Sequence, residues 1–213
     1  KGADINLLAG RLDLNPLMEC ARTGDLEMAK LLVEKGADVQ VINKMGMTAT
    51  HWALLNGQNQ AEEIALLLIE KGSKVETKAF NGETPLMTAV RKGYSKAVKA
   101  LLEKGADPLV VEQSSQQTLL HKASIRGYGE IAALLTKYGV DVNAKDVHGN
   151  TALFYAARYG NKSVVDILNA IRTSKTKIED IYNPSKILKG EIGKNEAYIC
   201  LLYTSPSPRD RTR

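Results

Sequence analysis

The sequence predicts an all-α fold, an α-solenoid in which short helix pairs stack one upon the next. The first reason is that glycine, threonine and leucine recur with one period along most of the 213 residues. The second is that the stretches between these markers carry apolar residues at helical spacing, bounded by residues that start and stop helices. The composition, 44% apolar and 25% charged, is typical of a folded globular protein.

Three marker series keep the same register. Within each series, successive members lie 33 to 36 residues apart, which is the period of a helical repeat protein. Because one unit of this size cannot bury its own apolar face, neighbouring units must stack to form a core. The three series are Asn15, Thr48, Thr84, Thr118 and Thr151; Gly24, Gly57, Gly93, Gly127 and Gly160; and Gly2, Gly36, Gly72, Gly105 and Gly139.

Each repeat is expected to hold two helices and a projecting turn, which we call a finger. The threonine hydroxyl caps the first helix by accepting a hydrogen bond from a free N–H group of its first turn. Pro16 and Pro85 then occupy the first helical position, where a missing N–H costs little. A glycine ends each helix, and the finger runs from the second glycine to the next threonine.

Three strings of the sequence carry a family resemblance. NPLMECARTGDLEMAKLLVEKGADV, GETPLMTAVRKGYSKAVKALLEKGADP and GNTALFYAARYGNKSVVDIL resemble ankyrin repeats, whose pattern is G-x-T-P-L-H-x-A-A, a turn glycine, then L-L-x-x-G-A-D-V-N. The matches span residues 15–170 as five repeats, and residues 1–6 resemble the end of an earlier repeat. The resemblance implies a protein-binding array in which the fingers and the exposed side of the first helices line one concave face.

Three departures from the repeat pattern predict local differences. Three extra residues lie within Gly57–Gly72, so the second helix of that repeat, or the loop leading into it, is expected to be longer. The finger within Ala106–Thr118 is one residue longer and lacks the turn glycine of the others, which predicts a different shape. Ala49-Thr50 replaces Pro-Leu, so the packing of this first turn is expected to differ.

The ends of the chain need a separate interpretation. Residues 1–170 are predicted to be an ankyrin repeat domain, part of a larger array. Residues 171–199 are interpreted as a degenerate sixth repeat or as a capping helix plus linker. The string CLLYTSPSPRD back-translates to a sequence resembling the transposase-end adapter of sequencing libraries, so residues 200–213 are interpreted as an assembly artefact. The alternative is a tail phosphorylated at Ser205 and Ser207.

The net charge is much lower when residues 171–213 are left out. The net charge of +5 includes +2 from residues 200–213 and +2 from residues 171–199, so residues 1–170, with 20 basic and 19 acidic groups, carry only +1. Nucleic-acid binding is therefore disfavoured, since it requires a strongly basic domain. The most apolar window, Ile64–Ile69, is too short to cross a membrane. Two cysteines form no disulfide framework, and an intracellular location, in the cytoplasm or the nucleus, is expected.

No set of residues predicts catalysis or a cofactor. The string GYGEIA, residues 127–132, matches a dinucleotide fingerprint formally, but a predicted helix precedes it where the fingerprint needs a strand. His51 and His121 share one repeat position, where ankyrin repeats commonly place histidine for hydrogen bonding along the stack. No acid or cysteine recurs beside them to complete a metal site. We therefore predict a protein that is not an enzyme and has no metal and no cofactor.

The predicted contact surface lies on the fingers and on the first helices. Ile42, Met45, Met47 and Phe80 are apolar residues in turns, which are usually polar, and exposed apolar clusters mark contact sites. We call this group the apolar finger patch. The alternative is that these are ordinary turn residues. The full predicted surface comprises Met45, Met47, Leu55, Lys78, Phe80, Glu83, Arg91, Lys92, Ile125, Arg126, Lys145, Val147, His148, Asn150, Arg158 and Tyr159.

Basic residues recur at the ends of the first helices and form a second feature of this surface, which we call the basic ladder. Its members are Arg22, Arg91, Lys92, Arg126 and Arg158. Arginine is a usual interface anchor, although solvated helix ends explain the same pattern. The ladder predicts a partner that presents acidic as well as apolar groups.

Two functions are compatible with these features. The preferred one is a non-catalytic protein–protein interaction module, a scaffold or adaptor that binds a protein partner through its concave face. The alternative is a regulatory or substrate-targeting arm of a larger enzyme or channel whose working domain is absent from this fragment. The residues alone identify neither the partner nor the attached domain, because fold does not dictate function.

Overall fold

The protein is described by a computed structural model covering residues 4–57 and 60–175. These residues form helices and turns, and their only β-structure is three isolated bridges. The chain divides into two compact units at Val110 and Val111, called unit 1 and unit 2 below. Residues 1–3, 176–199 and the predicted artefact 200–213 lie outside the described residues.

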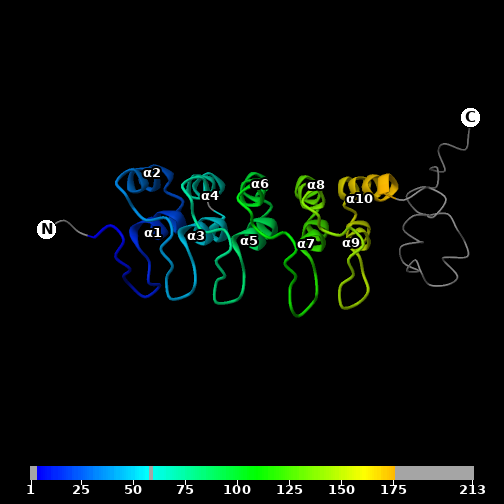
Figure 1. Ribbon diagram of the computed structural model, residues 1–213, viewed down its shortest axis with the longest axis horizontal. Helices are drawn as coiled ribbons and strands as arrows, with labels where there is room; N and C mark the ends of the chain where they lie inside the picture. Colours follow the sequence, from blue (N-terminus) through cyan, green and yellow to red (C-terminus); the bar gives the residue numbers. More distant parts are fainter. Residues whose placement is uncertain (1–3, 58–59, 176–213) are drawn as a thin grey trace, which may run out of the picture. The chain divides into compact units, whose positions relative to one another are not determined.

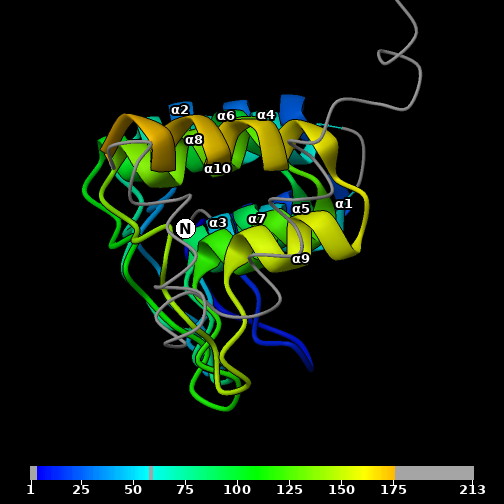
Figure 2. The same cartoon turned by 90° about the vertical axis from the view of Figure 1, so that its right-hand side faces the viewer.

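Unit 1 contains three helix pairs. Figure 2 shows the first helices of these pairs in one layer and the second helices in another, with the fingers projecting beyond the first layer. Successive first helices contact each other, and so do successive second helices, so the core lies between and within the pairs (Figure 1). The helices are α1 (Pro16–Thr23), α2 (Leu26–Glu34), α3 (Ala49–Asn56), α4 (Ala61–Glu70), α5 (Pro85–Lys92) and α6 (Ser95–Glu103).

Unit 2 contains two helix pairs of the same design. Its first helices, α7 (Leu119–Arg126) and α9 (Ala152–Arg158), contact each other. Its second helices, α8 (Gly129–Lys137) and α10 (Lys162–Lys175), pack together in the other layer. Helix α10 continues to Lys175, so the boundary predicted at residue 170 falls inside a helix. Within each unit, the stacked pairs confirm the predicted all-α solenoid class.

Helices α1, α5, α7 and α9 begin as the sequence predicts, whereas the Thr48 hydroxyl before α3 lies 3.0 Å from Nδ1 of His51. The side chain of Asn15 accepts a hydrogen bond from the Met18 amide at 2.8 Å. The hydroxyls of Thr84, Thr118 and Thr151 accept from the amide three residues further on, at 3.3 or 3.4 Å. Each contact satisfies a backbone donor that the first turn of a helix leaves free.

The fingers are closed by two backbone hydrogen bonds. In the second repeat, the Asn43 amide donates to the Met47 carbonyl at 3.1 Å and the Gly46 amide donates to the Asn43 carbonyl at 2.9 Å. In the finger before Thr118, the Glu112 amide donates to the Gln117 carbonyl, one residue further on than in the regular fingers. The different shape predicted for this finger is therefore confirmed.

Neighbouring fingers are joined by further hydrogen bonds. In unit 1, the Phe80 amide donates to the Met45 carbonyl at 2.8 Å, and a Cβ at Gly46 would lie only 2.6 Å from the Lys78 carbonyl oxygen. In unit 2, the Val147 amide donates to the Ser115 carbonyl at 3.1 Å. In these two pairs, a backbone hydrogen bond joins one finger tip to its neighbour.

The extra residues of the second repeat lengthen both the helix and the loop before it. Helix α4 has 10 residues, whereas α2 and α6 have 9. Its N-cap residue, Gln60, has a φ of +69° and makes no side-chain capping bond. Glu62 in the first turn of α4 accepts from the amides of Lys96 and Ala97 at 2.9 and 3.1 Å. This carboxylate supplies the cap that α6 lacks in its own sequence, because Tyr94 makes no capping bond.

The substitution of Pro-Leu in the second repeat is compensated by a buried polar pair. Thr50 stands where the other first helices of unit 1 have the buried leucines Leu17 and Leu86. Its hydroxyl donates to the hydroxyl of Ser73 at 2.6 Å, and both residues are buried. Ser73 in turn stands where the next repeat has Ala106. The two polar residues therefore replace an apolar pair and satisfy each other.

Removal of one hydroxyl of this pair should cost more than removal of both. We expect Ser73→Ala to lower the free energy of unfolding by about 1–3 kcal/mol, because the Thr50 hydroxyl stays buried without its partner. The double variant Thr50→Val with Ser73→Ala should recover most of that loss, since both partners are then apolar. Urea unfolding of the two single variants and the double variant measures the coupling. Additive effects of the two substitutions would contradict a direct interaction.

A second expectation concerns the longer finger. Gln116 has a φ of +53° at the place where Gly46, Gly82 and Gly149 stand in the other fingers. Because a side chain in this region costs about 1–2 kcal/mol, Gln116→Gly should raise the free energy of unfolding by up to about 1 kcal/mol after the entropy of glycine is counted. The measurement is the urea midpoint, with Gln113→Gly in the same finger as control. A lower midpoint for Gln116→Gly than for the control would contradict the strain.

Candidate functional site

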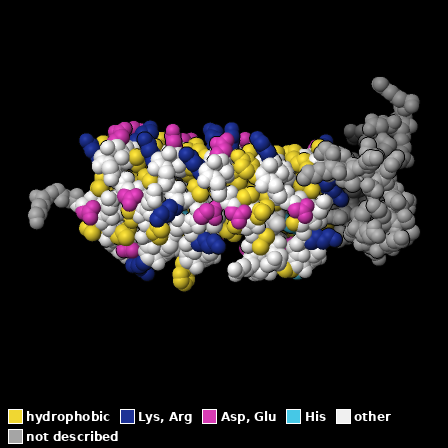
Figure 3. Space-filling view, viewed as in Figure 1, with side chains coloured by type: hydrophobic (Ala, Val, Ile, Leu, Met, Phe, Trp, Pro, Cys, Tyr) yellow, Lys and Arg dark blue, Asp and Glu magenta, His cyan; other side chains and the backbone are white. Residues whose placement is uncertain are grey.

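The candidate surface of unit 1 is formed by its finger tips. Phe80 is 94% exposed, which is exceptional for a large apolar side chain in a folded protein. Ile42 is exposed and Met45 is half-buried on the neighbouring finger. Lys78 is exposed two residues before Phe80, and Figure 3 shows hydrophobic and basic side chains together on this finger edge of unit 1. The tips therefore offer an apolar surface with adjacent positive charge.

Met47 does not belong to this surface, contrary to the sequence prediction. Its side chain is only 7% exposed and packs in the core. The residue lies directly before the helix cap, and its carbonyl is held by the Asn43 amide. A finger residue at this position faces the helices, whereas Met45, at the tip, faces outward in part. The apolar finger patch is therefore reduced to Ile42, Met45 and Phe80.

The cations predicted on the first helices of unit 1 are largely engaged within their own repeats. An Arg91 guanidinium nitrogen lies 3.1 Å from a carboxylate oxygen of Glu83, which directly precedes Thr84, the N-cap of the same helix. Arg22 forms two hydrogen bonds with Glu19, of which the one from Nε measures 2.9 Å. The half-buried Lys92 is oriented differently, because its ammonium lies close to Gly57 at the end of α3. A helix C-terminus attracts cations, so this placement stabilises the fold.

Leu55, also predicted on this face, is half-buried near the end of α3. Helix α3 contacts α5, so part of this side chain is covered within the unit. It contributes a small apolar area to the surface of unit 1.

The candidate surface of unit 2 combines aromatic, apolar and basic side chains. Arg126 and Arg158 are exposed near the ends of α7 and α9, and Ile125 is half-buried beside Arg126. Tyr159 is 54% exposed and follows Arg158 directly. The fingers add a further group of exposed residues, namely Lys145, Val147 and His148, with Asn150 half-buried.

A buried network supports the finger of unit 2. The Tyr155 hydroxyl donates to a carboxylate oxygen of Asp146 at 2.6 Å. The other oxygen of Asp146 accepts from the amides of His148 and Asn150 at 2.9 and 3.0 Å. Burial raises the pKa of Asp146, but the bonds from Tyr155 and the two amides outweigh it, so this pKa lies below its usual value. The finger is thus tied to α9 by an ionised, fully engaged carboxylate.

The two buried histidines hold backbone groups together. Nδ1 of His121 accepts from the Thr118 amide at 3.2 Å, and Nε2 lies 3.1 Å from the carbonyl oxygen of Asn150 in the next repeat. Hydrogen bonding along the stack is therefore confirmed for His121. His51 binds the Thr48 amide in the same way, but its Nε2 has no partner in hydrogen-bond geometry among the described residues. Burial lowers the pKa of both histidines, so the neutral form is favoured.

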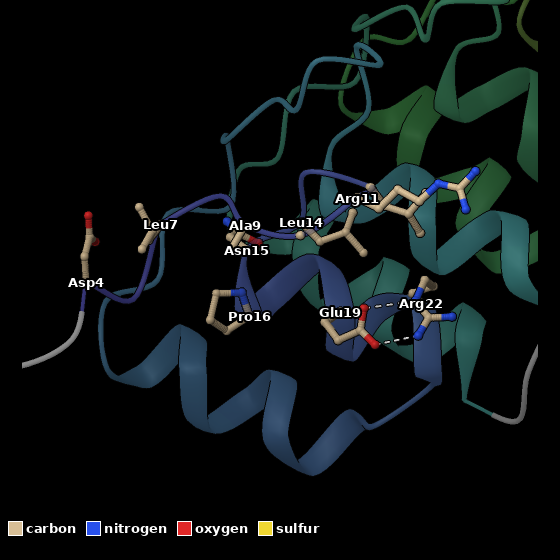
Figure 4. Close-up of a pocket in the computed structure, with 11 residues that line it drawn as sticks. Asp4, Leu7, Ala9, Arg11, Leu14, Asn15, Pro16, Glu19 and Arg22 are labelled. Carbon is tan, nitrogen blue, oxygen red and sulfur yellow. Dashed lines mark hydrogen bonds and ion pairs between the residues drawn. The ribbon is translucent and has the colours of Figure 1, made fainter.

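A shallow pocket lies at the first finger and α1 of unit 1 (Figure 4). Its lining is largely apolar, with Leu7, Leu14 and Pro16, and the Glu19–Arg22 pair lies at one side. Pro16 is exposed here, whereas its counterparts Ala49 and Pro85 in the following repeats are buried. The pocket therefore consists of positions that stacking covers elsewhere in the unit, and it brings no nucleophile, base or metal-binding set together.

Two further searches of the described part of the chain are relevant to function. No group of three or more histidine, cysteine, aspartate or glutamate side chains is placed to hold a metal ion there. The helices of residues 4–57 and 60–175 include none long and apolar enough to span a membrane.

The chain matches the family described as Ankyrin repeats (3 copies), over residues 1–79, 17–112 and 107–177. These matches cover most of the chain and all five helix pairs described above. The chain belongs to the ankyrin repeat family. Ankyrin repeats are protein-interaction modules, so the exposed fingers and first helices described above are the part of this chain to consider for binding.

The proteins to which the chain is similar are of several kinds. The chain is 33% identical over 169 residues to the human palmitoyltransferase ZDHHC13, covering 79% of this chain and 27% of the relative. It is 33% identical over 173 residues to human ankyrin repeat and SOCS box protein 3, covering 66% and 33%. It is 32% identical over 150 residues to the transient receptor potential cation channel subfamily A member 1 homolog of Caenorhabditis elegans, covering 70% and 12%. The chain spans a third or less of each of these relatives.

Several functional and supporting residues of these ankyrin repeats could not be found from the pattern. Tyr155 stands at a position occupied by Glu19, Trp52, Thr88 and Lys122 in the other repeats, so no regularity marks it. The pairing of Arg91 with Glu83 was equally hidden, because the two are eight residues apart and belong to different elements. The Arg91–Glu83 pair could have been suggested only by comparing the charged residues of neighbouring repeats position by position.

The neutral histidines predict how the stability of the ankyrin repeats depends on pH. Because the pKa of His121 and of His51 is lower in the folded than in the unfolded chain, their stabilisation is complete above the unfolded pKa of about 6.5 and is lost as the pH falls below it. Urea unfolding should therefore show a constant midpoint near neutral pH and a decrease toward about pH 5.

The matched variants are His121→Gln and the exposed His148→Gln. His121→Gln should reduce the fall of the urea midpoint between neutral and mildly acidic pH. His148→Gln should leave that fall unchanged. An unchanged pH profile for both His121→Gln and the corresponding His51→Gln would contradict this assignment.

Proposed function

We propose that this chain is a non-catalytic protein-recognition module that binds a partner through its fingers and the exposed side of its first helices. The observation that carries the proposal is the exposure of Phe80 on a finger whose backbone is fixed by Met45. A large apolar side chain held in water at a rigid tip has no role in the core. Aromatic side chains of this kind act as anchors in protein interfaces.

The charge around Phe80 adds a preference for the partner. Lys44 and Lys78 are exposed on the same fingers, and no described acid forms an ion pair with either side chain. Three acids on these fingers and the one before are engaged elsewhere: Asp13 accepts from the Lys44 amide at 3.0 Å, Glu76 accepts from the Asp107 amide at 2.8 Å, and Glu83 pairs with Arg91. The proposed partner of unit 1 therefore presents apolar groups flanked by acidic ones.

A second function is favoured by the comparisons. Two of the relatives are a palmitoyltransferase and a cation channel, and the matched part makes up 27% and 12% of their lengths. We propose as the alternative that the chain is the regulatory or substrate-targeting arm of such a larger protein. An intracellular location, in the cytoplasm or the nucleus, is part of both proposals. The same binding surface serves both, so its test is common to them.

The surface can be tested by site-specific crosslinking. Replacement of Phe80 with a photo-crosslinking phenylalanine analogue should yield one recurrent protein adduct in cells, because a partner would cover this tip. The same analogue at Lys99, which is exposed on the second-helix layer, is the control. The readout is the set of adducts identified by mass spectrometry.

The identified partner then allows an affinity measurement. Phe80→Ala with Met45→Ala should weaken its binding by about tenfold or more, since an interface anchor contributes about 2 kcal/mol. The variant should keep the unfolding midpoint of the parent chain, because neither side chain belongs to the buried core. Equal adduct patterns at positions 80 and 99, together with unchanged affinity, would remove the finger surface from the proposed function.

A further inference from the structure

The ends of α7 and α9 in unit 2 present a second exposed surface, which combines apolar, aromatic and basic side chains. It consists of Ile125 and Arg126 at the end of α7 and of Arg158 and Tyr159 at the end of α9. We call these four residues the helix-end surface. Helices α7 and α9 pack side by side, and each ends in one apolar or aromatic side chain and one cation.

These cations differ from those of unit 1. Arg22 and Arg91 are each bound to an acid of their own repeat, Glu19 and Glu83. Among the described residues, no acid forms an ion pair with Arg126 or Arg158. The basic ladder predicted from the sequence is therefore uneven. In unit 1 its arginines are neutralised, and in unit 2 they remain available to a partner.

The fold does not require Arg126 to complete its helix. Arginine in a last turn can be explained by the free carbonyl groups of the helix end. At the end of α7, however, the Asn161 side chain donates to the carbonyl oxygens of Ser124 and Ile125 at 2.7 and 3.2 Å. Since this amide already satisfies those acceptors, the guanidinium of Arg126 has no capping task there.

Tyr159 adds an ordered apolar platform. Its ring stacks on that of Tyr155 at 6.5 Å between centroids with an interplanar angle of 16°. The guanidinium carbon of Arg158 lies 6.0 Å from the centre of the Tyr159 ring. Tyr155 is itself fixed by its bond to Asp146. The exposed ring is thus held in place by a buried neighbour, which lowers the entropy lost when a partner covers it.

Two acids of unit 2 are engaged within the unit. Glu112 is bound by Lys122 at 2.7 Å and also accepts from the Ser115 hydroxyl. Asp146 is buried and accepts from Tyr155. Lys145, exposed on the finger, has no ion-pair partner among the residues that the structure describes. Glu112 and Asp146 therefore leave Arg126, Arg158 and Lys145 without an ion-pair partner in the described part of the chain.

We propose that the helix-end surface of unit 2 binds an extended acidic segment of a partner protein, one in which carboxylates are interleaved with apolar side chains. The carboxylates pair with Arg126 and Arg158, and the apolar side chains cover Tyr159 and Ile125. Arginine is suited to this task because its planar fork binds a carboxylate through two parallel hydrogen bonds. The proposal rests on the proposed function and specifies the partner chemistry for unit 2.

The probe is a library of randomised displayed peptides, selected on the full chain. The enriched peptides should contain more aspartate and glutamate than the starting library, together with apolar residues. The double variant Arg126→Glu with Arg158→Glu should lose the acidic enrichment. The matched control, Lys137→Glu with Lys162→Glu, makes the same change of net charge on the second-helix layer and should keep it.

Affinities for one selected peptide make the comparison quantitative. The double reversal should weaken binding by about tenfold or more, and raised salt should weaken binding to the parent chain and to the control alike. Tyr159→Ala should weaken it by about fivefold, since an exposed aromatic anchor is removed. Circular dichroism of each variant confirms that the helices are formed.

Three results would overturn the proposal. Enriched peptides without acidic bias, or no enrichment, would show that this surface does not recognise an acidic segment. Acidic peptides whose binding survives the double reversal would place the recognition elsewhere, and protein recognition at Phe80 would stand unaffected. A fluorescent single-stranded RNA that binds the parent chain and is lost on reversal, with no peptide enriched, would assign the surface to nucleic acid.

Discussion

Stacking between neighbouring repeats is the interaction on which the rest of this structure depends. Helices α1 to α9 have between 7 and 10 residues each, and helices of that length are not stable alone in water. Each is formed because the next pair covers its apolar face, as the contacts of α1 with α3 and of α7 with α9 show. Everything exposed on the fingers is positioned by this packing.

The same constraint explains how much the sequence predicts. Where every repeat needs a cap or a buried side chain at the same position, the same residue type recurs there. Thr84, Thr118 and Thr151 were therefore identified correctly as caps. The longer finger before Thr118 followed from counting residues. The strain at Gln116 did not, because only the backbone shows which residue takes the positive φ that glycine takes elsewhere.

Interactions that occur in a single repeat could not be read from the pattern. Thr50 looked like a defect in its repeat, and the compensating Ser73 lies 23 residues away, so only the structure shows the bond between them. Met47 was placed on the surface because turns are normally exposed, yet the residue before a cap is turned toward the helices and buried. Arg91 and Arg158 occupy the same repeat position, but the acid that binds Arg91, Glu83, is replaced by Asn150 in the repeat of Arg158.

The energetics of one exposed anchor bear on how such a surface can work. Covering the side chain of Phe80 returns about 1.5–3 kcal/mol of hydrophobic free energy, whereas association costs about 4–15 kcal/mol in lost translational and rotational freedom. One finger tip is therefore insufficient, and a stable complex needs contacts from several repeats. The bonds between neighbouring fingers, such as that from Phe80 to Met45, supply this requirement by holding successive tips in fixed positions before a partner arrives. A chain of this kind gains affinity by adding repeats in register, since each added finger brings contacts whose backbone is already ordered.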